Sequence, residues 1–156
     1  MPSDTDGRRF TRRRLLAAGS AAAAAGLAGC TLGRSSQVRC GSTGEGGGQT
    51  IRTLRATPGE EDAYLLIGVP ASQVPDPLDA LRVYDGADRL VHDIPVQDTA
   101  DLNQWEPDGI GGDEVPFPVN LGEPPVHGDY RVEAVSDGTV VAEATLEFNC
   151  FVDAPR

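Results

Sequence analysis

The chain has 156 residues, and all 13 of its basic residues are arginine. The absence of lysine excludes Schiff-base chemistry, a Ser-Lys catalytic dyad and a P-loop lysine. From Cys30 onward eight arginines face 22 carboxylates, a net charge of −14, which argues against nucleic acid and anionic lipid head groups as partners. Because concentrated salt screens charges over a few ångströms, we interpret this surface as adaptation to high salt. An ordinary acidic domain is the alternative.

The first 29 residues have the features of an export signal. Arg12 and Arg13 precede an uncharged run from Leu15 to Leu27. The run has 13 residues, too few for a helix to cross a bilayer core of ~30 Å but suited to the apolar part of a signal peptide. A weakly hydrophobic run after an arginine pair resembles a twin-arginine signal, a resemblance that implies export of an already folded protein.

The apolar run ends in Leu27, Ala28, Gly29 and Cys30, which resemble a lipobox. Combined with the acidic, lysine-free chain that follows, this pattern resembles the lipoproteins of halophilic archaea. The resemblance implies a lipid on the Cys30 thiol and a location on the extracytoplasmic face of the cell membrane. One lipid chain binds a membrane only marginally, so a diether lipid or a protein contact would complete the anchor. An amphipathic helix with a chance cysteine is the alternative interpretation.

Residues 30–49 are rich in glycine and serine and lack apolar periodicity. This composition predicts a lipidated Cys30 followed by a flexible tether. A phosphate-binding loop is a poorer interpretation of the glycines, because no Gly-Lys-Ser sequence follows them. The folded domain is then expected over residues 50–156.

Residues 50–156 consist of short apolar segments separated by Pro, Gly and Asp clusters, a pattern typical of all-β domains. Leu65-Leu66-Ile67 is apolar without alternation, as in a strand buried on both faces. Asp137-Gly138 and Asp85-Gly86 are typical of tight hairpin turns. About seven strands are predicted: 50–56, 63–69, 81–85, 89–96, 114–121, 130–136 and 139–150.

The segment from Gly128 to Ala134, with Tyr130 and Val132 in alternation, leads into the predicted terminal hairpin. It resembles the closing strands of immunoglobulin-like and fibronectin type III-like domains. The resemblance implies an immunoglobulin-like β-sandwich. The Cys…Trp…Cys core of antibody domains is not reproduced, because Trp105 lies in a predicted loop.

With Cys30 assigned to the lipid, Cys40 and Cys150 remain. Two leftover cysteines in an exported protein usually pair, and this pair would tie together the two ends of the domain. Two free thiols, or a Cys40 buried against a partner, are the alternatives.

The segment from Asp98 to Glu114 combines clustered carboxylates with Trp105, the sole tryptophan. It predicts a solvated loop, a calcium site of six to eight oxygen ligands, or a ligand- or partner-binding loop built around Trp105. The Asp-x-Asp-x-Asp-Gly spacing of an EF-hand is absent, and all three interpretations stay open. The acidic candidates for such a binding loop are Asp98, Asp101, Glu106, Asp108 and Asp113.

No motif in the sequence indicates catalysis: Gly-x-Ser-x-Gly and His-Glu-x-x-His are both absent. A blue-copper site is excluded because no histidine follows Cys150 and Met1 is the sole methionine. We therefore predict a non-enzymatic, membrane-anchored module that binds an envelope protein or a ligand. The alternatives are a small extracytoplasmic hydrolase or metal-dependent enzyme with an unrecognised carboxylate site, and a cation-binding structural envelope protein.

Overall fold

The computed structural model describes residues 37–97 and 107–153. These residues form eight β-strands and one short 3-10 helix, and all seven predicted strands are present with ends shifted by a few residues. The strands are β1 (Val38–Gly46), β2 (Thr53–Pro58), β3 (Ala63–Pro70), β4 (Ala80–Asp85), β5 (Leu90–Pro95), β6 (Glu114–Gly122), β7 (Val126–Ser136) and β8 (Thr139–Val152), with the helix η1 (Ala71–Gln73) after β3.

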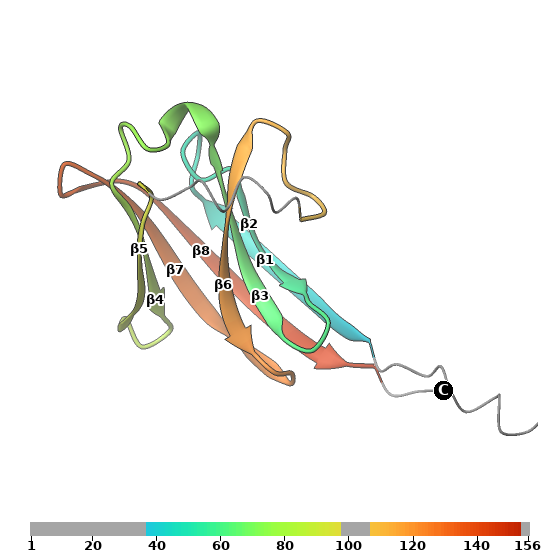
Figure 1. Cartoon of the computed structure of the whole chain (residues 1–156). Helices are drawn as coiled ribbons and strands as arrows, with labels where there is room; N and C mark the ends of the chain where they lie inside the picture. The colour runs from blue at the N-terminus through green and yellow to red at the C-terminus, as the bar shows by residue number, and fades with distance from the viewer. Residues whose placement is uncertain (1–36, 98–106, 154–156) are drawn as a thin grey trace, which may run out of the picture. The chain divides into compact units, whose positions relative to one another are not determined.

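The strands form two antiparallel sheets, and Figure 1 shows the smaller sheet lying across the larger one. The five-stranded sheet has the order β1-β8-β7-β4-β5, and the three-stranded sheet has the order β2-β3-β6. Buried side chains from both sheets form one apolar core, including Phe117 of β6 and Leu146 of β8. The predicted all-β sandwich is therefore confirmed.

Strand β1 shows that the prediction of a flexible tether is wrong for residues 38–46. The sequence places residues 38–46 in a flexible linker, but they pair with β8 from Val38↔Val152 to Gly46↔Ala144. The glycines at 46, 47 and 48 all have positive φ, and the Ile51 N–H donates to the Gly47 carbonyl at 3.0 Å. Positive φ costs glycine little, so these residues make the turn from β1 into β2. The folded domain begins at β1 rather than at residue 50.

The predicted disulfide joins Cys40 of β1 to Cys150 of β8, which are direct cross-strand partners. Cys150 is fully buried. The bridge spans 110 residues of sequence and ties together the strands at the two ends of the domain.

Both predicted hairpins are present. Asp137 and Gly138 have positive φ between β7 and β8, as an Asp-Gly turn requires. Residues 86–89 join β4 to β5, with Asp88 at positive φ. These turns place β7, β8, β4 and β5 side by side in one sheet.

The sheet edges differ in how far they are open to pairing. The β1 edge lies against β2, where Ser42 Oγ accepts a hydrogen bond from the Ala56 N–H at 3.1 Å. The β6 edge contains Pro116 and Pro118, which have no N–H to donate. The β5 edge exposes Leu90 and Val91, at 49% and 40%. In the described ranges, no helix is long and apolar enough to cross a membrane.

Candidate functional site

The residues of the predicted export signal and lipid anchor lie outside the described residues. They are Arg12, Arg13, Leu27, Ala28, Gly29 and Cys30. In the acidic loop, Asp98, Asp101, Trp105 and Glu106 also lie outside them. The described part of that loop starts at Pro107 and leads into β6. This part of the loop borders the clearest candidate site among the described residues.

Residues 107–113, which we call the cover segment, fold over the outer face of the three-stranded sheet. Ile110 lies against Gly68 of β3, and a Cβ added to Gly109 would clash with the guanidinium of Arg55. Asp113 fixes the end of the segment, because its carboxylate pairs with Arg52 at 2.6 Å and its carbonyl accepts from the Ala71 N–H at 2.8 Å. The predicted acidic loop is therefore, in this part, a packed element of the domain.

Leu66 is completely buried although it faces away from the core, on the face of β3 where the cover segment contacts Gly68. Leu65 and Ile67 lie in the core cluster, whereas Leu66 is 0% exposed and is not part of that cluster. Side chains alternate across a strand, so Leu66 points to the outer face, where the register places it between Arg55 and Pro118. This confirms the prediction from Leu65-Leu66-Ile67 that both faces of β3 are covered.

A cleft of about 840 Å³ lies beside the cover segment on the same outer face. A volume of this size is ordinary for small-molecule sites, which are mostly apolar with a few placed polar groups. Three rigid proline rings form much of its wall and Tyr64 supplies the aromatic surface. The residues that line it are Arg55, Thr57, Pro58, Gly59, Tyr64, Pro107, Asp108 and Pro118.

Arg55 is the cationic group of this cleft. It comes from the middle of β2, opposite Leu66 of β3, and it is partly buried beneath Gly109. Its Nε is buried without a hydrogen-bond partner in the described part of the chain. A buried polar atom without a partner costs free energy, so this position of Arg55 is unfavourable for the fold.

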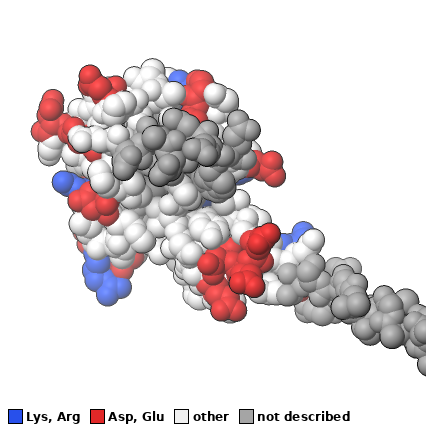
Figure 2. Space-filling view, viewed as in Figure 1, with Lys and Arg blue, Asp and Glu red and all other residues white. Residues whose placement is uncertain are grey.

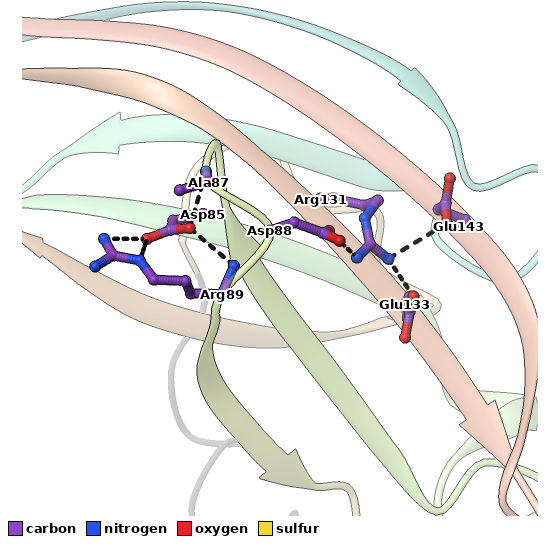
Figure 3. Close-up of polar contacts among 7 residues, drawn as sticks. All are labelled: Asp85, Ala87, Asp88, Arg89, Arg131, Glu133 and Glu143. Atoms are coloured by element: carbon purple, nitrogen blue, oxygen red, sulfur yellow. Dashed lines mark hydrogen bonds and ion pairs between the residues drawn. The ribbon is translucent and has the colours of Figure 1, made fainter.

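A second hollow, of about 470 Å³, lies beside the β4–β5 hairpin and contains Arg131. Figure 3 shows that Arg131 is already neutralised: it contacts Asp88 at 2.5 Å, Glu143 at 3.4 Å, and Glu133. Its guanidinium also lies 4.1 Å from the centre of the Tyr84 ring, a cation–π geometry. These contacts raise the pKa of Arg131, first through the hydrogen bond to Asp88. The cluster joins the β4–β5 hairpin to β7 and β8.

The neighbouring hairpin is closed in a similar way. The Asp85 carboxylate accepts hydrogen bonds from the backbone N–H groups of Ala87 and Arg89, both at 3.0 Å, and from Arg89 Nε at 2.8 Å (Figure 3). The side-chain hydrogen bond from Arg89 is the main cause of the lowered pKa of Asp85. These contacts satisfy the turn and leave no open cation for a ligand.

We expect Arg131→Met to lower the melting temperature more than Arg82→Met. The first change leaves Asp88, Glu133 and Glu143 without their shared counter-charge, whereas the one described carboxylate paired with Arg82 is that of Asp93, at 4.0 Å. The difference should be larger in dilute buffer than in concentrated salt, because salt screens exposed charges. Thermal melts at both salt concentrations test this, and equal losses for the two variants would contradict a structural role for the cluster.

Carboxylates form several separate groups on the face shown in Figure 2, some of them with an arginine beside them. One acidic hollow lies where β1 begins and β8 ends, lined by Glu60, Glu61, Asp62 and Glu123 with Val38 and Val152. Among residues 37–97 and 107–153, no three His, Cys, Asp or Glu side chains converge in an arrangement suited to a metal ion. The described part of the predicted calcium loop therefore offers no such site.

Comparison with protein-family models, curated proteins and solved structures gave no match to this chain. The cleft is therefore interpreted from its own geometry and chemistry. Sequence reasoning named Asp108 as one candidate for a possible binding loop, and Asp108 lines the cleft. It missed Arg55 and Tyr64, although the unbroken apolar run around Leu66 indicated that the second face of β3 had to be covered.

Proposed function

We propose that this chain is a non-enzymatic, lipid-anchored binding module on the extracytoplasmic face of the cell membrane. The observation that carries the binding role is the cleft on the three-stranded sheet, which combines Arg55, Tyr64 and rigid proline walls. Such a surface loses little conformational freedom when a ligand binds, because proline and tyrosine side chains have few rotatable bonds. Its ligand belongs to another envelope component or is a free molecule.

The anchor is supported by the lipobox resemblance at Cys30, and the length of chain that follows limits how far β1 can lie from that cysteine. Cys30 and Val38 are eight residues apart, and eight extended residues reach at most ~29 Å. Strand β1 must then begin within that distance of the lipid-bearing cysteine. Since β1 is fastened to β8 by the Cys40–Cys150 bridge, one short connection would hold the whole sandwich near the membrane.

We expect Cys30→Ser to move the protein from the membrane fraction to the soluble fraction in high salt. Intact-mass analysis should show a lipid adduct on the wild-type chain and none on the variant. Replacing Arg12 and Arg13 with lysine should leave an unprocessed precursor, whereas replacing Arg8 and Arg9, outside the proposed signal pair, should not. A full-length, unlipidated wild-type chain would contradict the anchor.

The binding role is tested separately, by nuclear magnetic resonance with a fragment set of anionic, neutral and cationic members. Binding fragments should shift the amide resonances of Leu66 and Val119, which lie in the strands beneath the cleft. Tyr64→Ala should abolish these shifts, whereas His92→Ala, an exposed position on the other sheet, should leave them unchanged. If no fragment shifts these resonances, the cleft is not a binding site, whatever the outcome of the anchor test.

A further inference from the structure

Six arginines lie in the described residues, and their ion pairs set Arg55 apart. Five of the six have a carboxylate oxygen within 4.0 Å, whereas no described carboxylate lies so close to Arg55. This is notable in a chain where carboxylates outnumber arginines so heavily. The pairs are Arg39 with Asp153, Arg52 with Asp113, Arg82 with Asp93, Arg89 with Asp85, and Arg131 with Asp88, Glu133 and Glu143.

The position of Arg55 shows that the absence of a carboxylate partner among the described residues does not come from free exposure to water. Its Nε is buried without a partner, Gly109 lies against its guanidinium, and its side chain forms part of the cleft wall. Asp108 lines the same cleft, but no ion pair within 4.0 Å joins it to Arg55. The cleft therefore contains a partly desolvated cation that has no described carboxylate within 4.0 Å, and this cation lies beside apolar rings.

We propose that the cleft binds a ligand through a carboxylate group, which the Arg55 guanidinium contacts, while the Tyr64 and proline rings contact the apolar or ring part of the same ligand. This inference rests on the proposed binding function and names its ligand chemistry. A guanidinium presents parallel N–H donors that match the two oxygens of a carboxylate. Asp108 is exposed at the rim, so its charge disfavours ligands with a second negative group nearby.

A carboxylate of this kind can come from the C-terminus of a peptide or from a uronic acid sugar. Both present one negative group next to a ring or an apolar chain. Because a domain with a net charge of −14 repels anions at low salt, the site should work best where salt screens the long-range repulsion but not the direct contact. The Debye length is about 3 Å at 1 M salt, shorter than the spacing between most of the surface charges and the cleft.

The test compares matched probe pairs on the full chain carrying Cys30→Ser, in about 2 M NaCl. One pair is N-acetylprolylproline and its C-terminal amide; the other is methyl glucuronoside and methyl glucoside. We expect the carboxylate member of at least one pair to bind, and Arg55→Gln to weaken that binding about 10- to 100-fold. Arg82→Gln, on the other sheet, should change it less than about twofold. The pair that responds identifies the source of the carboxylate.

Two further measurements keep the result interpretable if Arg55→Gln alters the fold. In the unsubstituted Arg55 chain, the carboxylate probe should shift the Arg55 Nε–Hε resonance and the amide or neutral probe should not. Arg55→Lys keeps the charge but loses the parallel donors, so it should weaken binding by less than Arg55→Gln. Equal binding of both members of each pair would overturn the carboxylate inference and leave the binding function standing. Absence of any probe or fragment at the cleft would overturn both.

Discussion

Replacing Cys40 and Cys150 with serine together should lower the free energy of unfolding by about 4–5 kcal/mol. In the chain-entropy model, a cross-link that closes a loop of this length removes that much conformational freedom from the unfolded state, and the bridge spans 110 residues. The loss should be concentrated at β1. Most side chains of β1 are exposed and it contains Gly41, Gly44 and Gly46, so little besides the bridge and the β8 ladder holds it.

Denaturant unfolding of the Cys40→Ser/Cys150→Ser chain in high salt measures this effect, and Ser42→Ala is the control for a change on β1 that keeps the bridge. Ser42→Ala should cost about 1 kcal/mol, the usual value for one hydrogen bond, because it removes the acceptor for the Ala56 N–H. Hydrogen exchange at β1 should accelerate in the serine pair variant before exchange in β7 does. If the double variant loses less than about 1 kcal/mol of unfolding free energy, the bridge does not restrict the conformational freedom of the unfolded chain as expected.

Much of the sandwich was predictable because the patterns that specify its strands and hairpins lie within short stretches of the sequence. Strand β8 alternates buried Ala144, Leu146 and Phe148 with exposed residues, and the Asp-Gly dipeptide before it specifies the hairpin. Strand β1 was missed because its pairing is not local. Only Val38 is buried in it, and its partner lies at the other end of the chain, so its sequence shows composition but no apolar periodicity.

The cleft was only partly predictable for a similar reason. Asp108 was a candidate because it lies in the acidic loop. Arg55 and Tyr64 come from two different strands, and only the pairing of these strands brings them onto one face, in the register Arg55↔Leu66 and Thr57↔Tyr64. No pattern within either strand marks these residues as a site. The one local signal is Leu66: an apolar residue on the outer face of a sheet requires a cover, and the cover segment forms one side of the cleft.

Leu66→Ala should lower the free energy of unfolding by about 2–5 kcal/mol, the usual range for a buried leucine. The side chain is 0% exposed, so the variant loses its transfer free energy and leaves a cavity that the neighbouring β-strands cannot easily fill. Because Leu66 lies outside the core cluster, the cavity opens on the outer face of the sheet, the face that the cover segment contacts at Gly68 and Arg55. The variant should therefore also weaken the binding of any ligand that contacts Arg55.

Val91→Ala is the control, because Val91 is a β-strand residue of similar character that is 40% exposed. It should change stability by no more than about 0.5 kcal/mol. Denaturant unfolding gives both values, and hydrogen exchange at residues 109–113 should accelerate in Leu66→Ala alone. If Leu66→Ala costs no more than Val91→Ala, the cover segment does not pack on β3, and the wall that places Gly109 against Arg55 is absent in solution. Leu66→Ala should thus lower the free energy of unfolding and weaken ligand binding at Arg55 together, because both depend on the same packed layer.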